Sequence, residues 1–168
     1  MSIHGEIRNT AGVIGRPAAP PPGPRAVLAG WIAALAATVG FMPLHVVWAA
    51  GIPLFADAER FRVWHSDGGG FYLWTLTGLA ILPAVYAFAL IRPWGLRLPR
   101  MLLIVPGYAL VVALGGYTVL AVVLSVVQWD SPEAIFRPWT GIYGIGQFTV
   151  WVGALVVALR SYARRTRI

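Results

Sequence analysis

The sequence contains no cysteine and no lysine, and it holds few acidic residues. The absence of cysteine excludes disulfide bonds, thiolate metal sites and cysteine nucleophiles. All 13 basic residues are arginines, 6 residues are acidic, and charged residues make up only 11% of the chain. Because a soluble domain usually carries about 25% charged residues, this composition indicates that lipid surrounds much of the surface.

Four long apolar runs lack Asp, Glu, Arg and Lys altogether, and they cover residues 26–51, 71–91, 101–127 and 139–159. A membrane-spanning helix needs about 20 mostly apolar residues, so each run is long enough to cross a bilayer. A soluble bundle would instead show polar faces at the helical period. Short connections place neighbouring spans antiparallel. The predicted fold is all-α: a polytopic membrane protein with an up-and-down four-transmembrane-helix bundle over residues 26–159.

The arginines are distributed unequally between the two ends of the predicted bundle. Ten lie in the flexible proline-rich tail 1–25, the second connection and the basic tail 160–168, whereas three lie in the first and third connections. An excess of arginine marks the cytoplasmic side of a membrane protein. The sequence therefore predicts a multi-pass protein of the inner membrane with both termini cytoplasmic. Since the arginines sit at helix ends, the net charge of +7 does not indicate a nucleic-acid partner.

The first connection contains the signature of a short helix lying at the membrane interface, over about residues 57–65. Asp57 is a suitable N-cap residue, and Phe61 and Trp64 are three residues apart, so they share one face of a helix. The run Gly68–Gly70 is expected to end this segment. In the third connection, Ser131-Pro132-Glu133 has the form of a helix start or a short turn.

Small residues and prolines recur inside the predicted spans. A stripe of small residues repeats every four positions at Ala26, Gly30, Ala34 and Thr38. Such a stripe allows two helices to approach closely, either within the bundle or between two copies of the chain. Kinks are expected at the in-span prolines Pro43, Pro83 and Pro106. Hydrogen bonds between spans are expected from the hydroxyls of Thr75, Thr77, Thr118 and Ser125.

His45 is the main candidate for a functional side chain, because it is an ionisable residue inside a predicted span. It lies about 9 Å from the outer end of that span, at 1.5 Å per residue, and shares a helix face with Trp48. Two interpretations remain open: a functional group, or a neutral histidine that bonds a polar group on another span. Gln147 and Tyr143 are the expected partners. The predicted ligand-binding set is His45, Trp48, His65, Asp67, Tyr143 and Gln147.

A resemblance accompanies these residues. The pattern His45-x-x-Trp48-Ala49-x-Gly51, near the end of the first span, and the stretch Arg92–Arg100 before the third resemble a group of four-span membrane proteins of GC-rich bacteria. The resemblance covers about residues 40–125. It implies the four-span fold and topology, but the group has no established activity that would imply a mechanism.

The predicted function is that of a non-enzymatic membrane protein that binds a small or lipidic ligand or serves as an accessory subunit. The alternative is a small oligomeric transporter or channel with an outward-facing polar cavity around His45. An enzyme is less favoured, because no paired carboxylates or nucleophile–base spacing is present. No ligand spacing indicates a metal, and a bis-histidine haem would need a second in-span histidine. The expected partners are the lipid bilayer and a second copy or another membrane protein.

Overall fold

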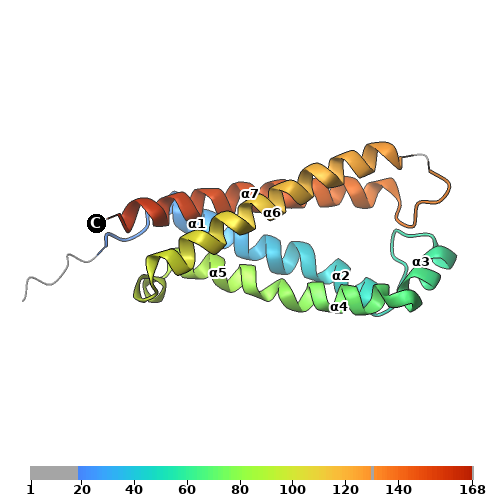
Figure 1. Ribbon diagram of the computed structural model, residues 1–168, viewed down its shortest axis with the longest axis horizontal. Coiled ribbons are helices and arrows are strands. Elements are labelled where there is room, and N and C mark those ends of the chain that lie inside the picture. The colour runs from blue at the N-terminus through green and yellow to red at the C-terminus, as the bar shows by residue number, and fades with distance from the viewer. Residues whose placement is uncertain (1–18, 130, 168) are drawn as a thin grey trace, which may run out of the picture.

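The computed structural model describes residues 19–129 and 131–167, and every regular element within them is a helix. Four helical stretches are long and apolar enough to cross a membrane: Pro24–Ala49, Ala58–Ile91, Arg100–Val127 and Pro138–Arg165. They run up and down in chain order (Figure 1). The prediction of a multi-pass membrane protein with an all-α four-helix bundle is therefore confirmed. Most of the predicted N-terminal tail, residues 1–18, lies outside the described residues.

The elements are, in chain order, α1 (Pro24–Leu35), the π-helical segment η1 (Ala36–Phe41), α2 (Met42–Ala49), α3 (Ala58–Trp64), the π-helical turn η2 (His65–Gly69), α4 (Gly70–Leu79), α5 (Ile81–Ile91), the 3-10 helix η3 (Pro93–Arg97), α6 (Arg100–Val127) and α7 (Pro138–Arg165). Helix α7 continues past residue 159, so residues 160–165 of the predicted basic tail are helical. Its continuation is stabilised by packing, because Tyr162 and Ala163 are buried.

Two of the three predicted kinks interrupt their helices. In the first span the helix widens into η1, which ends two residues before Pro43, whose ring lacks an N–H and crowds the preceding turn. In the second span, Ala80 separates α4 from α5 three residues before Pro83. The third prediction differs, because α6 remains a continuous helix through Pro106. Spans one and two are therefore each divided into two shorter helices, whereas spans three and four are not.

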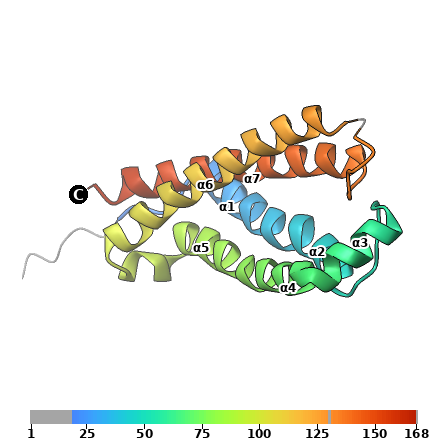
Figure 2. The ribbon, with the colours of Figure 1, turned by 45° about the vertical axis from the view of Figure 1, so that its right-hand side comes forward.

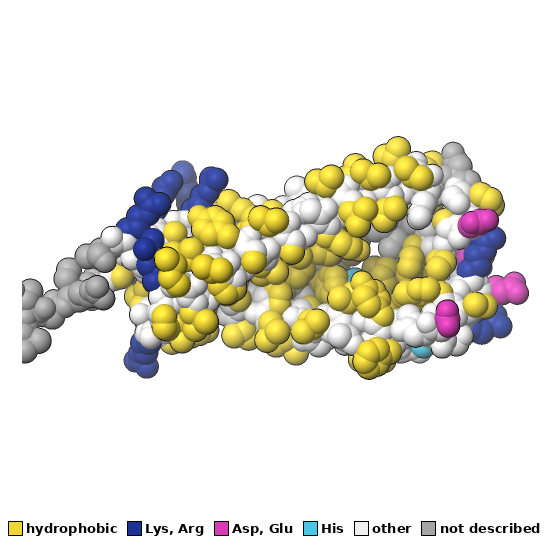
Figure 3. Space-filling model, viewed as in Figure 1, with side chains coloured by type: hydrophobic (Ala, Val, Ile, Leu, Met, Phe, Trp, Pro, Cys, Tyr) yellow, Lys and Arg dark blue, Asp and Glu magenta, His cyan; other side chains and the backbone are white. Residues whose placement is uncertain are grey.

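The two ends of the bundle carry different residues. We call the end that holds the start of α1, the end of α7 and the connection 92–99 the arginine end, and the end with the connections 50–57, 128–129 and 131–137 the loop end. Arginines gather at the first, and the acidic side chains lie at the second together with a few arginines (Figure 3). The described acidic residues at the loop end are Asp57, Glu59, Asp67 and Glu133.

The arginine half of the bundle is closely packed. Helices α1, α5 and α7 contact one another there around a core rich in alanine, in which Ala33, Ala87 and Ala158 are completely buried. The small-residue stripe faces this core: a Cβ atom on Gly30 would lie 2.6 Å from Cγ2 of Ile91. The stripe thus packs within the bundle, which is the first of the two alternatives predicted for it.

The loop half separates into two helix pairs. Helix α2 packs on α4, and α6 packs on α7, whereas α6 hardly contacts α4 (Figures 1 and 2). The separation begins where η1 and the Ala80 break bend the first two spans away from the last two. Helix α6 therefore lies at the edge of the bundle, with apolar side chains exposed along its length.

The first and third connections close the loop end over this separation. The backbone N–H of Asp57 donates to the carbonyl of Ile135 at 2.8 Å, and that of Arg137 donates to Phe55 at 3.0 Å. An isolated antiparallel bridge pairs Ala56 with Phe136. The segment that begins at Ser131 forms a turn and no helix among its described residues, so the short turn, and not the helix start, is the alternative that the structure contains.

The short helix predicted in the first connection is present as α3. Asp57 caps it by accepting a hydrogen bond from the N–H of Arg60 at 3.0 Å. Phe61, a residue of this helix, is buried, and the rings of Phe61 and Trp64 both contact Phe136. The glycine run then reverses the chain sharply into α4, with Gly68 at a φ of 98°.

Candidate functional site

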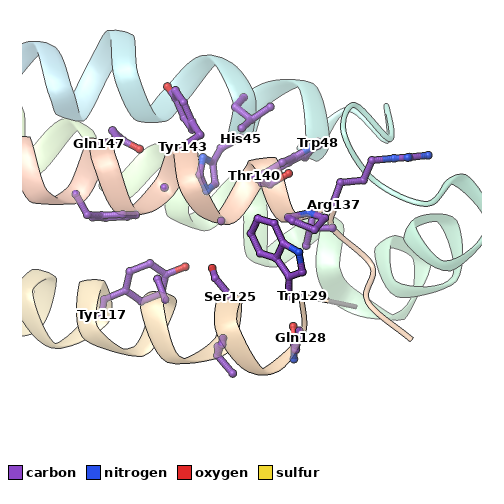
Figure 4. A pocket seen from close by; sticks show the side chains of 18 residues that line it. His45, Trp48, Tyr117, Ser125, Gln128, Trp129, Arg137, Thr140, Tyr143 and Gln147 are labelled. Atoms are coloured by element: carbon purple, nitrogen blue, oxygen red, sulfur yellow. The ribbon is translucent and has the colours of Figure 1, made fainter. Parts of the chain in front are cut away.

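A lateral cleft lies between the two helix pairs of the loop half, with a volume of about 250 Å³. Side chains from α2, α6 and α7 line it, and Trp129 and Phe136 border it at the loop end. Figure 3 shows the hollow from outside, and Figure 4 shows its lining from close by. Because α4 and α6 stay apart, the cleft opens sideways, toward the lipid that surrounds the bundle.

His45 lines this cleft but does not bond the partners predicted for it. Its Nδ1 lies 2.8 Å from the carbonyl oxygen of Phe41, in the preceding turn of the same span. The imidazole stacks on the Phe41 ring, with centroids 3.7 Å apart, and meets Trp48 edge to face at 5.3 Å. A partner within its own helix thus replaces the expected partner from span four.

Tyr143 and Gln147 bond the backbone of the π-helical segment instead. The Tyr143 hydroxyl donates to the carbonyl of Gly40, and Nε2 of Gln147 donates to the carbonyl of Ala36 at 3.0 Å. A widened helical turn weakens its own backbone hydrogen bonds, so its carbonyls are free to accept from a neighbour. Both side chains line the cleft and also hold α7 against η1 at the base of the separation.

Two polar residues of α6 complete the site, and the predicted set did not include them. Tyr117 and Ser125 face the cleft from the side opposite His45, with their hydroxyls directed into it (Figure 4). Among the described residues, neither hydroxyl has a hydrogen-bond partner. The pattern 117, 121, 125 follows one face of a helix at four-residue spacing, and this signal was present in the sequence.

The threonines expected to link spans do not do so. Thr75, Thr77 and Thr118 each donate to the carbonyl four residues earlier in their own helix. This local bond is always within reach of a threonine in a helix, and it satisfies the hydroxyl without a neighbour. Of the four hydroxyl residues, Ser125 alone makes no such bond among the described residues and faces the cleft.

Trp48 and His65 hold the end of α2. The Trp48 indole lines the cleft and donates to the carbonyl of Leu54 at 2.8 Å. Gly51 ends the helix in the left-handed region at a φ of 83°, and the N–H of Ile52 donates back to Val47 at 3.1 Å. Trp48 and Gly51 of the pattern that begins at His45 thus both serve to end α2.

The remaining predicted residues, His65 and Asp67, lie outside the cleft. His65 Nε2 is 3.1 Å from the carbonyl of Ala49, which it caps at the C-terminal end of α2. Asp67 is exposed at the reversal between α3 and α4. Within the described part of the chain, no cluster of three or more His, Asp or Glu side chains is arranged to hold a metal ion. The cleft thus brings together four of the predicted residues, His45, Trp48, Tyr143 and Gln147.

Comparison with known proteins adds no assignment, because no family model, no curated protein and no solved structure matches this chain. The resemblance to four-span proteins of GC-rich bacteria therefore stays a prediction. The functional argument depends on the geometry of the cleft.

Proposed function

We propose that this protein binds a lipidic amphiphile in the lateral cleft and performs no chemistry on it. The observation that carries the proposal is the convergence of three polar groups without protein partners in the described structure. These are Nε2 of His45 and the hydroxyls of Tyr117 and Ser125, which come from two helices that the cleft separates. The lining also includes Gln128, Arg137 and Thr140 near the loop end, and the rest of it is mostly aliphatic and aromatic.

The energetics of a membrane interior support a ligand at this position. A polar group in an apolar environment without a hydrogen bond costs about 1–3 kcal/mol by mutational data. Three such groups facing one another are stabilised by a ligand that carries a polar head. Because the cleft opens toward lipid, an amphiphile enters it sideways, with its head at the polar groups and its chain between α4 and α6.

The chemistry of the lining favours binding over catalysis. No carboxylate is found among the described cleft residues, and His45 has no acidic partner there. General acid–base or nucleophilic catalysis normally pairs such a histidine with a second functional group. Binding requires only the shape and the hydrogen-bonding groups that are present.

The binding proposal is tested with a phosphatidylglycerol that carries a photoactivatable diazirine on its acyl chain. In liposomes, cross-links are expected on residues 117–125 of α6 and 140–148 of α7. Ala121, which is partly buried in the cleft wall, is replaced by tryptophan to fill the cleft, and the cross-links there should be lost. Val119, 65% exposed on the outer face of the same helix, supplies the control: Val119→Trp should leave them unchanged. Uniform labelling of all lipid-facing helices, or no effect of Ala121→Trp, contradicts the proposal.

The transporter alternative retains one supporting observation, the coincident breaks of spans one and two at η1 and Ala80. These breaks would allow α2 and α4 to move together.

We also propose that the arginine end faces the cytoplasm of a cell with an inner membrane, from the excess of arginine at that end.

Single-cysteine variants test both points, since the native chain has no cysteine. Ser66→Cys and Ser161→Cys should react with a membrane-impermeant maleimide from opposite sides, with Ser66 on the outside. Ser125→Cys should be unreactive from the arginine side. Labelling of Ser125→Cys from both sides would favour a transporter over a binding protein.

A further inference from the structure

The hydrogen bond of His45 determines which of its ring nitrogens carries a proton. A backbone carbonyl oxygen only accepts hydrogen bonds, and Nδ1 lies 2.8 Å from that of Phe41. Nδ1 must therefore hold the proton and donate it. In a neutral imidazole the other nitrogen, Nε2, is then an acceptor with a free lone pair.

The imidazole is held in this state by its surroundings. An imidazolium ion buried in apolar surroundings is costly without a counter-charge, and no carboxylate lines the described part of the cleft. The stacked Phe41 ring on one side and the Trp48 edge on another restrict rotation of the imidazole. A flipped ring would also lose the bond to the Phe41 carbonyl. The site thus presents an acceptor in a fixed direction.

Across the cleft, the hydroxyls of Tyr117 and Ser125 can each donate or accept a hydrogen bond. Figure 4 shows them directed into the space beside His45. A group that donates to Nε2 and accepts from one of these hydroxyls would give hydrogen bonds to polar groups on both sides of the cleft at once. A hydroxyl is the smallest group that does both. The volume of about 250 Å³ corresponds to roughly eight water molecules, taking about 30 Å³ for each, so the cleft accommodates a small head and the first few carbons of a chain.

We propose that the ligand of this cleft is an amphiphile with a free hydroxyl head, a long-chain alcohol in its simplest form, whose O–H donates to His45 Nε2. This inference rests on the proposed binding function and adds the class of head group. An ether or ester oxygen accepts but cannot donate, so it would leave Nε2 without a partner. The cleft therefore discriminates a hydroxyl from its methylated equivalent.

The test uses hexadecan-1-ol with a diazirine on its chain as the probe in liposomes, with hexadecan-1-ol and 1-methoxyhexadecane as competitors. The alcohol should displace the cleft-specific label about tenfold better than the ether, because the ether leaves a buried acceptor unpaired. His45→Phe should bring this ratio near to one. His45→Gln restores an acceptor oxygen and should retain most of the preference. Thr149→Val, which removes an exposed hydroxyl that bonds its own helix outside the cleft, should leave the ratio unchanged.

The outcomes separate the two proposals. Equal displacement by alcohol and ether in the native protein overturns the hydroxyl assignment and leaves the binding function standing. A preference that persists undiminished in His45→Phe also overturns it. If no competitor displaces label from the cleft residues, the binding function itself fails. If His45→Phe does not fold, the alcohol-to-ether ratio in the native chain and in His45→Gln still tests the hydroxyl assignment.

Discussion

The two halves of this bundle are built from the same four spans, yet one is closed and the other is divided. In the arginine half, buried alanines such as Ala33 and Ala87 let the helix backbones approach closely. In the loop half, aromatic side chains such as Trp48 and Phe148 occupy the corresponding interior. Small side chains pack helices together in a membrane, where no hydrophobic force drives association. The comparison indicates that side-chain size and helix breaks, rather than hydrophobicity, determine where a membrane bundle opens.

Polar contacts reinforce the same difference. In the arginine half, Tyr86 donates to the carbonyl of Leu103 at 2.6 Å, and Arg165 donates to that of Leu90 at 2.7 Å, so that neighbouring spans are joined directly. In the loop half, Tyr143 and Gln147 reach only the widened turn at its base. Beyond that turn, Tyr117 and Ser125 of α6 face the cleft without a hydrogen-bond partner among the described residues.

The largest expected effect comes from enlarging one alanine in the closed half. Ala33 is fully buried, so Ala33→Leu should lower the free energy of unfolding by about 1–3 kcal/mol through overpacking. The matched change Ala121→Leu, in the cleft wall, should have little effect on stability and should weaken probe binding. Unfolding in detergent micelles with increasing dodecyl sulfate measures both. Equal losses of stability would show that the two halves are packed alike.

A smaller effect is expected at the junction of the halves. Gln147→Leu removes the bond to the Ala36 carbonyl and should cost about 0.6 kcal/mol, the average for hydrogen bonds between membrane helices, and at most about 1.7 kcal/mol. Thr149→Val, two residues away, removes a bond within α7 and should cost less. The same unfolding assay compares the two variants. If they are equally stable, Gln147 does not hold α7 to the π-helical segment.

The smallest effect on stability, but an informative one on shape, is expected at Pro43. Pro43→Ala restores an N–H and favours a regular helix through η1, which should bring α2 toward α6 and narrow the cleft. Spin labels at Val46 and Val126, both exposed, would report a shorter distance by pulsed electron resonance. Pro106→Ala, in a helix that is already continuous, should leave that distance as it is. An unchanged distance in Pro43→Ala would show that the kink at Pro43 does not determine the width of the cleft.

The four-helix architecture was predictable from sequence because it depends on long apolar runs, which lipid solvation imposes on any spanning helix. The capping of α3 by Asp57 was predictable for a similar reason, since a cap involves residues only three apart. Both features are local in sequence. The kinks at Pro43 and Pro83 belong with them, whereas the unbroken α6 around Pro106 shows that a proline alone does not interrupt a helix.

The site was predictable only in part. His45 and Trp48 were identified from their position in a span, but the partner of His45 was wrong because the Phe41 carbonyl satisfies Nδ1 within one turn. The bonds from Tyr143 and Gln147 depend on the widening of η1, for which the sequence offers no pattern beyond Pro43. The four-residue spacing from Tyr117 to Ser125 is visible in the sequence, but their place in a site depends on α6 lying apart from α4, which is a property of the packed bundle.

The backbone tie between the two connections at the loop end changes the mechanics of the divided half. Without the bonds from Asp57 to Ile135 and from Arg137 to Phe55, the two helix pairs would be joined only at the base of their separation. Bending there would then move the loop ends of the two pairs apart. With these bonds, the two helix pairs are joined both at the base of the separation and at the loop end. Such an arrangement resists separation of the two pairs, so it keeps the width of the lateral opening nearly constant.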